Sequence, residues 1–378
     1  MKVGFFHDHK FINKDGIIYT TGTLDSNVWN RFLDHNIDEL IVCAREGETN
    51  SIDISKLAIS SRDNVKFIFS PNLSNIRSLV SGYNKSIVEE AVRQVDVIVC
   101  RLPSEIGFAA IKFAKKYNKI ALCEVVACPY DALSYHGSFL AKIYASVIKY
   151  RMKNSVKNCK GALYVTQSEL QKRYPNLGIN QNASNVELNE IKSDCIEVRA
   201  SRFEERRLSG QLKFGLIGTM KNDTKGIDIA IKALTNKAAT LHILGSGNPQ
   251  RFIDMADKYN VSLKYDGFLS DKNAVFEWLD DIDIYLQPSY QEGLPRATIE
   301  AMSRGCIVLS SNAGGLPELV LPKYIHNSGD INKLASDIES LYTNLEPIHE
   351  IIHSVNVSCQ YLSPVLSKKR NEFYGKFL

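Results

Sequence analysis

The sequence predicts an α/β protein with two doubly wound parallel sheets, one in each half of its 378 residues. Short apolar runs alternate with segments of helical period, as buried parallel strands alternate with the helices that connect them. A polar stretch at 176–210 interrupts this alternation, which starts again at Lys213. We therefore expect two domains, 1–187 and 188–358, followed by a C-terminal helix at 359–378.

The expected elements of the first half follow the chain from its beginning. Strands are expected at 3–6, 40–43, 66–69, 95–100, 120–126 and 162–166, and helices at 86–93 and 106–116. A long polar loop is expected after the first strand, and it leads to a helix that Asp25 or Ser26 caps. In doubly wound folds the loops at the carboxyl ends of the strands carry functional residues.

The second half repeats the same alternation. Strands are expected at 213–218, 240–244, 282–286 and 306–310, and helices at 227–234, 295–304 and 330–342. A polar turn with Gly293 follows the third of these strands; Pro295 suits the first position of the next helix and Gly305 its end. Free backbone amides and the positive end of the helix dipole make this turn an anion site.

Two glutamates frame this turn, Glu292 within it and Glu300 inside the helix. A carboxylate accepts paired hydrogen bonds from neighbouring hydroxyls of a sugar, while amides at a helix start bind phosphate. The pattern therefore favours a nucleotide-sugar ligand. The alternative is that both glutamates are solvated charges at a helix end, which is the better interpretation of either one taken alone.

The segment 292–308, EGLPRATIEAMSRGCIV, resembles the signature of the retaining glycosyltransferases of family 4, which have the GT-B fold. The resemblance implies two Rossmann-like domains that face a cleft, with the C-terminal helix returning to the first domain. It also implies that Glu292 faces the donor sugar as a catalytic residue and that Glu300 faces the ribose. Amides around Gly293 would meet the diphosphate.

A basic pair before a helix is the next feature shared with this family. Lys225 matches its second member, whereas Thr219 stands at the first and Lys221 compensates; a solvated loop lysine is the alternative for Lys225. Loops at Gly245 and Phe268 would line the base pocket. The implied donor-binding residues of the second domain are Gly218, Thr219, Lys221, Lys225, Gly245, Phe268, Leu269, Glu292, Gly293, Leu294, Pro295 and Glu300.

The resemblance also assigns residues of the first half. Many members carry a histidine directly after the fifth strand, and this chain does not, so the candidates for a catalytic base are Glu124, Asp131 and His136. His136 is equally consistent with an ordinary surface histidine. Arg45 and Arg101 directly follow strands, and each is expected to serve the acceptor or to pair with a local acid.

Gly22 matches a glycine loop that approaches the donor phosphate in this family, and a turn glycine without a ligand is the alternative. Two short acidic or histidine-containing motifs suggest metal sites. His7-Asp8-His9 is interpreted instead as a loop or as the lining of an acceptor cleft, because adjacent residues at a strand end point to opposite faces. Asp281-Ile-Asp283 begins a buried strand and is interpreted as structural, so no metal and no cofactor besides the nucleotide-sugar, UDP- or GDP-linked, is expected.

The segment 140–160 is expected to be a long basic helix. Its apolar stripe consists of Leu140, Ile143, Tyr144, Val147, Ile148 and Met152. Its basic residues are Lys142, Lys149, Arg151, Lys153, Lys157 and Lys160. Such a helix packs on the core with a solvated outer face, or lies on an anionic membrane surface. The resemblance favours the membrane, because polysaccharide-assembly enzymes of this kind usually act on a lipid-linked acceptor.

Composition excludes several classes of partner and compartment. With 46 basic and 42 acidic residues the formal net charge is +4, which indicates no nucleic-acid partner. The eight cysteines are widely spaced without a C-x-x-C motif, so a reducing compartment is expected rather than zinc binding or disulfides. The N-terminus reads as a strand rather than a signal peptide, and a cytoplasmic protein, at most peripheral on the inner face of the plasma membrane, is expected.

The resemblance implies transfer of a sugar from a nucleotide-sugar to a glycan or lipid-linked oligosaccharide with retention, in bacterial surface polysaccharide (O-antigen or capsule) synthesis. A nucleotide-sugar epimerase of the same fold is the nearest alternative, and it would need no acceptor. A two-domain ligand-binding protein is an alternative of another class, although it would be expected to carry a secretory signal. The missing G-x-G-x-x-G motif disfavours a dehydrogenase.

Overall fold

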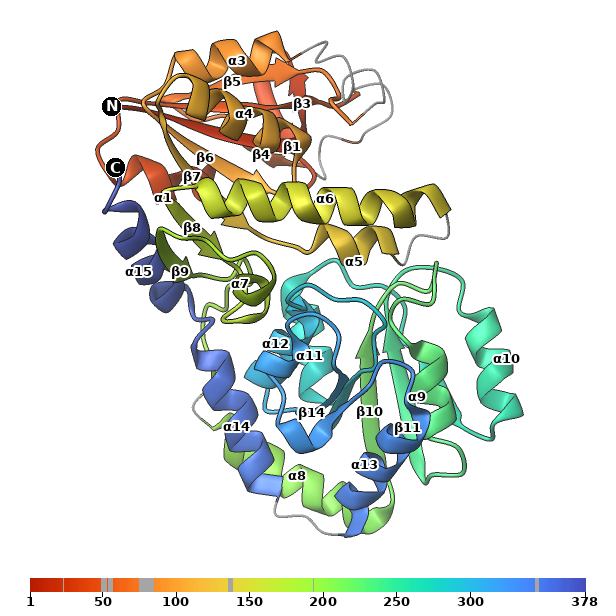
Figure 1. The fold of residues 1–378 in the computed structure, drawn as a ribbon. Coiled ribbons are helices and arrows are strands. Elements are labelled where there is room, and N and C mark those ends of the chain that lie inside the picture. Colours follow the sequence, from red (N-terminus) through yellow and green to blue (C-terminus); the bar gives the residue numbers. More distant parts are fainter. Residues whose placement is uncertain are drawn as a thin grey trace. The chain divides into compact units, whose positions relative to one another are not determined.

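A computed structural model describes residues 1–22, 24–48, 53, 57–74, 85–134, 139–192, 194–343 and 347–378. The chain forms two compact units (Figure 1). Unit 1 comprises Met1–Ala183 together with Ser367–Leu378, and unit 2 comprises Ser184–Leu366. The sequence placed the boundary after residue 187, and the contacts place it after Ala183.

Unit 1 is built on a sheet that has nine strands in the described residues. Its parallel part has the order β5-β3-β1-β6-β7-β8-β9, and β2 and β4 continue from β1 as antiparallel strands. The strands are β1 (Lys2–Lys14), β2 (Ile17–Thr20), β3 (Glu39–Glu46), β4 (Ala58–Ile59), β5 (Val65–Ser70), β6 (Val97–Leu102), β7 (Ile120–Val125), β8 (Gly161–Tyr164) and β9 (Ile179–Asn182). The strand β9 was not expected from the sequence.

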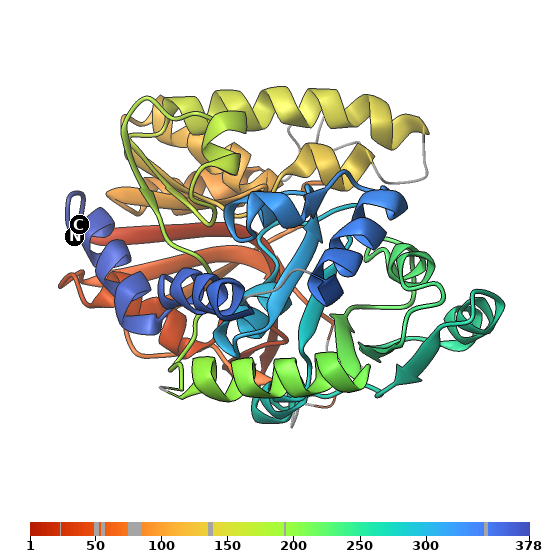
Figure 2. The same cartoon turned by 90° about the horizontal axis from the view of Figure 1, so that it is seen from below.

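Helices cover both faces of this sheet (Figures 1 and 2). They are η1 (Ser26–Trp29), α1 (Asn30–Leu33), α3 (Ser86–Arg93), α4 (Glu105–Lys116), α5 (Pro129–Ser134), α6 (Phe139–Asn158), α7 (Glu169–Arg173) and α15 (Ser363–Tyr374). Phe6 and Cys100 point into a core shared with α3, α4 and α6. Phe5 points to the other face and contacts Phe32 of α1, which contacts Tyr374 of α15.

The first strand is longer than the sequence predicted. The expected polar loop after Phe6 is wrong, because β1 continues to Lys14. Its register with β3 shifts between Phe6 and Lys10, so a bulge accommodates the polar residues within the strand. Asp8 lies in this bulge, and its carboxylate accepts hydrogen bonds from the amides of Glu105 (2.6 Å) and Ile106 (3.2 Å), which satisfies the first turn of α4.

The long helix α6 divides the predicted apolar stripe between a buried and an exposed face. Among the described side chains of this helix, Ala145, Met152 and Val156 are buried. Ile143 and Val147 belong to the predicted apolar stripe, and they are 54% and 48% exposed. With Tyr150, 72% exposed, they follow the i, i+4, i+7 spacing of one helix face. No helix in the described part of the chain is long and apolar enough to cross a membrane.

Unit 2 contains a parallel sheet of six described strands in the order β12-β11-β10-β13-β14-β15. They are β10 (Leu212–Ile217), β11 (Ala239–Leu244), β12 (Ser262–Tyr265), β13 (Ile284–Gln287), β14 (Ile307–Ser311) and β15 (Ile325–His326). The helical segments are α8 (Cys195–Ser209), α9 (Ile227–Ala233), α10 (Gln250–Lys258), α11 (Lys272–Asp280), α12 (Arg296–Ser303), η3 (Leu316–Glu318), η4 (Pro322–Tyr324), α13 (Ile331–Thr343) and α14 (Pro347–Cys359). One apolar core joins the sheet to these helices.

The helix α8 lies in the stretch that the sequence indicated to be irregular. The charged composition of this segment gave no indication that one of its arginines, Arg199, is buried, at 2% exposed. The Arg199 guanidinium donates to the carbonyl oxygens of Leu279 (3.0 Å), Ile282 and Arg304 (2.7 Å). Because these acceptors end other elements of unit 2, the arginine takes the place of an apolar residue and the helical period is lost from the sequence.

Candidate donor site in unit 2

The candidate site lies at the carboxyl ends of β10 and β13, which are neighbouring parallel strands. The loop 218–226 leads from β10 to α9, and the turn 288–295 leads from β13 to α12 (Figure 1). The adjoining ends of two parallel strands, each followed by a helix, form the usual place for a ligand in a doubly wound unit. The sequence predicted these two connections as the donor site.

Lys225 and Glu292, one from each connection, form an ion pair. The Lys225 Nζ and Glu292 Oε1 atoms are 2.7 Å apart. The Glu292 side chain is 7% exposed and the Lys225 side chain 27% exposed, so the carboxylate is enclosed and the ammonium reaches solvent. Gly226 has a φ of +66°, and a Cβ there would stand 2.1 Å from the carbonyl oxygen of Pro288, so only glycine lets the two connections approach.

Two neutral side chains also hold Glu292, and the sequence analysis did not assign them. Gln287 Nε2 lies 2.8 Å and Ser289 Oγ 2.7 Å from Glu292 Oε1. The Gln287 Oε1 atom in turn accepts hydrogen bonds from the hydroxyls of Tyr285 (3.0 Å) and Thr298 (3.3 Å). The one sequence feature that could have predicted this network is Gln287 itself, a polar residue at the end of an otherwise apolar strand.

The start of α12 leaves backbone donors unused. No described residue accepts a hydrogen bond from the amide of Gly293 or of Leu294. The Gly293 carbonyl is fixed by the Gly315 amide at 2.7 Å, and the space that a Gly293 Cβ would fill is open. Pro295 is the N-cap rather than the first residue of the helix, which begins at Arg296. Free amides at a helix start suit an anion.

Glu300 lies inside α12 and is 7% exposed. Burial raises the pKa of its carboxyl above the usual value, and the positive charge of Arg296, 3.7 Å away, partly offsets this. Glu292 and Glu300 therefore differ: Glu292 is held by three hydrogen-bond donors within 2.8 Å, whereas Glu300 has a longer ion pair with Arg296 and the weaker charge of Lys272.

The loop after β10 carries the other predicted diphosphate residues. The Gly218 amide donates to the Leu244 carbonyl oxygen at 2.9 Å, which ties this loop to the end of β11. Thr219 Oγ1 accepts from the Lys221 amide at 3.3 Å. The Lys221 side chain is exposed, and no carboxylate of the described residues pairs with it.

The residues that were predicted to line the base pocket lie in the loops after β11 and β12. The Gly245 amide donates to the Gly267 carbonyl oxygen at 2.7 Å, so the two loops are joined. Phe268 is 66% exposed beside this junction, and Leu269 is half-buried. Asp266 anchors the second loop through His242 Nδ1 and Trp278 Nε1, both at 2.8 Å.

In unit 1, the candidate base Glu124 lies in a closed ion-pair cluster. Its carboxylate is 3.0 Å from both Arg31 Nη1 and Arg101 Nη1 and 2.7 Å from the Tyr374 hydroxyl. Burial alone would raise the pKa of Glu124, but the two arginines and the tyrosine outweigh it and lower the pKa to about 2. A carboxylate so enclosed is a poor proton acceptor, so the contacts argue for a structural role. Arg101 pairs with a local acid, one of its two expected roles.

The other residues of unit 1 that were predicted as catalytic or acceptor-binding do not belong to the Glu124 cluster. Asp131 pairs with Arg173 at 2.6 Å. His136 lies outside the described residues. Arg45 is half-buried within the end of β3 rather than after it, and no carboxylate among the described residues pairs with it.

Gly22 lies at the end of a chain of hydrogen bonds. Its amide donates to Thr20 Oγ1 at 3.2 Å, and His9 Nε2 is 2.7 Å from the same oxygen. Burial, and then the charge of Arg101, lower the pKa of the neighbouring His7 to about 3. These histidines therefore lie within the bulged strand and not in a loop, and their expected place in the lining of an acceptor cleft stays a prediction.

Asp281 and Asp283, which resemble a metal-binding pair, are occupied by cations of the protein. Arg206 contacts both, with Nη2 2.6 Å from Asp281 and Nη1 3.2 Å from Asp283. The Lys213 ammonium is 2.5 Å from Asp281, and its amide donates to Asp283. Among the described residues no group of three or more histidine, cysteine or acidic side chains is placed to hold a metal.

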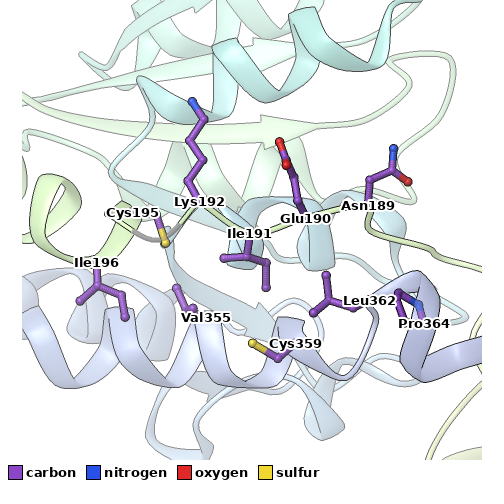
Figure 3. Close-up of a pocket in the computed structure, with 10 residues that line it drawn as sticks. All are labelled: Asn189, Glu190, Ile191, Lys192, Cys195, Ile196, Val355, Cys359, Leu362 and Pro364. Atoms are coloured by element: carbon purple, nitrogen blue, oxygen red, sulfur yellow. The ribbon is translucent and has the colours of Figure 1, made fainter.

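Unit 2 contains a hollow with a volume of about 450 Å³ (Figure 3). Its lining residues are Asn189, Glu190, Ile191, Lys192, Cys195, Ile196, Val355, Cys359, Leu362 and Pro364. Its walls come from the segment before α8 and the start of that helix, and from α14, the residues that join it to α15 and the start of α15. None of the predicted site residues lines it, so it is separate from the candidate donor site.

Comparison with known proteins identifies the family. Protein CapJ of Staphylococcus aureus is 32% identical over 344 residues, which cover 88% of this chain and 84% of CapJ. Residues 211–344, which include the whole candidate donor site, match the family described as glycosyl transferases group 1. The chain belongs to this family. The glycosyltransferase is also similar to the lipopolysaccharide glucosyltransferase WaaG of Escherichia coli (strain K12), 30% identical over 114 residues, 29% of this chain and 28% of WaaG.

Solved structures resemble this glycosyltransferase over its whole length. The lipopolysaccharide outer core galactosyltransferase WaaB has a TM-score of 0.68 at 17% identity and covers 100% of both chains. HepE of Anabaena in complex with UDP has a TM-score of 0.65 at 13% identity, again over 100% of both chains. These likenesses confirm the predicted GT-B fold of the glycosyltransferase, with two Rossmann-like α/β units.

Proposed function

We propose that this glycosyltransferase moves a sugar from a nucleotide-sugar to a glycan or lipid-linked oligosaccharide acceptor, with retention, in bacterial surface polysaccharide biosynthesis. The observation that carries the proposal is the pairing of Lys225 with Glu292 beside the free amides of Gly293 and Leu294. A diphosphate leaving group gains negative charge as the sugar departs. An ammonium and two amides fixed beside it would stabilise that charge in the transition state without a metal.

The two glutamates take different parts in the proposed donor complex. Glu292 would accept hydrogen bonds from the sugar hydroxyls and meet the positive character that develops at the sugar. Glu300, enclosed and with a pKa raised by burial, would accept hydrogen bonds from the ribose hydroxyls. Phe268 and Leu269 would contact the base, with the backbone at Gly245. UDP is the nucleotide to test first, because HepE was solved with UDP and with UDP-glucose.

The acceptor class follows from the relatives. WaaG and WaaB are a lipopolysaccharide glucosyltransferase and a lipopolysaccharide outer core galactosyltransferase. A bacterial glycan on a lipid is therefore the acceptor class we propose for this chain. Gly22, Arg45, Asp131 and His136 are unit 1 residues that we propose as candidates for contacts with donor or acceptor.

The outer face of α6 is the proposed site of contact with a membrane that carries such an acceptor. Ile143, Val147 and Tyr150 form its apolar row. A row of exposed lysines at four-residue spacing runs along the same helix, Lys149, Lys153 and Lys157. Apolar side chains that enter the interface, together with cations that meet anionic headgroups, are what peripheral binding requires.

The proposed reaction is tested in two steps. First, a panel of UDP- and GDP-sugars is screened by thermal shift; a ligand that binds only the folded protein raises the melting temperature, which selects the donor. Second, nucleotide release is measured with and without a bacterial glycolipid extract. Glu300→Ala should abolish turnover while circular dichroism shows intact folding. Turnover of Glu300→Ala at the wild-type rate, or nucleotide release independent of the acceptor, would contradict the proposal.

A further inference from the structure

We infer that Gln287 and Ser289 are positioning residues, which keep Glu292 in place while Lys225 exchanges this carboxylate for a bound diphosphate. The inference deepens the proposed function and rests on it, because it takes the anion that Lys225 meets to be the donor diphosphate. It concerns residues that no sequence pattern singled out, and it follows from how the hydrogen bonds of the site are distributed.

All three donors to Glu292 converge on one of its two oxygens. Lys225 Nζ, Gln287 Nε2 and Ser289 Oγ lie 2.7, 2.8 and 2.7 Å from Oε1. No described residue donates a hydrogen bond to Oε2. A carboxylate oxygen accepts more than one hydrogen bond, so this arrangement leaves Oε2 available for a sugar hydroxyl.

Gln287 cannot turn away from Glu292 without losing its other partners. Its Nε2 also donates to Ser289 Oγ at 2.7 Å, and its Oε1 accepts from the hydroxyls of Tyr285 and Thr298. The glutamine is 1% exposed and Ser289 is 0% exposed, so water cannot replace these partners. The amide is therefore fully satisfied in one orientation, and that orientation directs a donor at Glu292.

Lys225 is the partner that can leave. It reaches Glu292 from the loop 218–226 on a long flexible side chain, and it is more exposed than the carboxylate. A buried carboxylate that loses its only partner becomes an uncompensated charge, which is strongly destabilising. Gln287 and Ser289 remain after the lysine leaves, so Glu292 keeps two hydrogen bonds to its charged form. The exchange then transfers the ammonium to the diphosphate without displacing the carboxylate.

Removal of the Ser289 hydroxyl tests this inference, with Ser310→Ala as the matched control. Ser310 is equally buried, stands opposite Gln287 on the neighbouring strand β14, and donates only to the Ser311 carbonyl oxygen. Affinities for UDP and UDP-glucose are measured by calorimetry. Ser289→Ala should bind UDP within about twofold of wild type and lose roughly tenfold in UDP-glucose affinity, the effect of one hydrogen bond to a charged group. Ser310→Ala should change neither affinity.

A double-mutant cycle separates positioning from a general structural effect. In a Glu292→Ala background, Ser289→Ala should have no further effect on UDP-glucose affinity, because its partner is gone. The same cycle in urea unfolding without nucleotide should be non-additive. Additive effects in unfolding, or equal losses for UDP and UDP-glucose, would overturn the inference. Absence of binding of every UDP- and GDP-sugar of the panel by the wild-type protein would instead overturn the proposed function, while the unfolding cycle still decides whether Ser289 holds Glu292.

Discussion

Replacement of Glu124 by glutamine should destabilise unit 1 strongly, because it removes the centre of a buried charge cluster. The carboxylate is 3% exposed and pairs with Arg31 and Arg101, each at 3.0 Å. A folded pKa of about 2, against the ordinary 4.5, corresponds to about 3 kcal/mol at roughly 1.4 kcal/mol per pKa unit. The variant also removes the carboxylate that pairs with two nearly buried guanidinium groups, and breaking a buried ion pair costs about 3–5 kcal/mol in comparable cases. We therefore expect a loss of about 3 kcal/mol.

The assay is urea unfolding followed by fluorescence. The chain has two tryptophans, and Trp278→Phe leaves Trp29, which is buried in unit 1, as the reporter. Glu124→Gln in this background should lower the unfolding midpoint, whereas Glu89→Gln should have little effect because its ion pair with Lys116 is open to solvent. A loss below about 1 kcal/mol, the size of a surface pair, would refute the reasoning.

The pH dependence gives a second check on Glu124. Because its pKa is lower in the folded state, the carboxylate contributes stability at pH values above 4.5, and this contribution is lost as the pH falls towards 2. The difference in unfolding free energy between wild type and Glu124→Gln should therefore narrow over this range. A difference that stays constant as the pH falls would mean that the carboxylate is not stabilised by the two arginines.

Three further predictions concern the donor site and α6. Lys225→Met should weaken UDP binding roughly tenfold or more in calorimetry, because a hydrogen bond to a charged group is worth about 1.5–3 kcal/mol. Gly314→Ala should lower the melting temperature, because φ is +54° and the added Cβ would stand 2.2 Å from a carbonyl oxygen of the donor-site turn; Gly293→Ala enters open space and should retain stability. The double variant Ile143→Ser, Val147→Ser should reduce co-sedimentation with vesicles that contain phosphatidylglycerol.

Each of these predictions has a result that contradicts it. Unchanged UDP affinity in the Lys225 variant would remove the lysine from the site. Equal melting temperatures for the two alanine variants would show that the turn tolerates a side chain at either glycine. Leu177→Ser is the control for the α6 variant, since Leu177 is 77% exposed in the same unit. An equal loss of vesicle binding with Leu177→Ser would argue against a specific face.

Local patterns were sufficient to predict two doubly wound α/β halves and the two connections of the donor site, whereas the GT-B fold, which the structural neighbours confirm, was predicted from the family resemblance of the segment 292–308. Each connection was predicted from a strand that is followed by a glycine turn and a helix, within about a dozen residues. Lys225 and Glu292 were also predicted to belong to one site. They lie together in the structure because the strands that precede them, β10 and β13, are adjacent in this topology. Their roles in donor binding remain predictions.

The remaining features depend on contacts that no local pattern records. Arg31 and Tyr374 reach Glu124 from 93 and 250 residues away, so the sequence suggested a free catalytic base where the structure has a closed cluster. The helix α8 was missed because Arg199 occupies a core position. The strand β1 was predicted to be shorter than it is, because a bulge accommodates polar residues within the strand.

The division of the chain has a practical consequence for dissecting this enzyme. Unit 1 is completed by Ser367–Leu378, and Leu188 pairs with Leu362 in a short parallel bridge where the chain enters and leaves unit 2. A fragment ending at Ala183 would lack Tyr374 and with it one partner of Glu124, so it should be less stable than the same fold in the whole protein. Unit 2, in contrast, is one continuous stretch of sequence, so a fragment of residues 184–366 would lose no segment of its own chain.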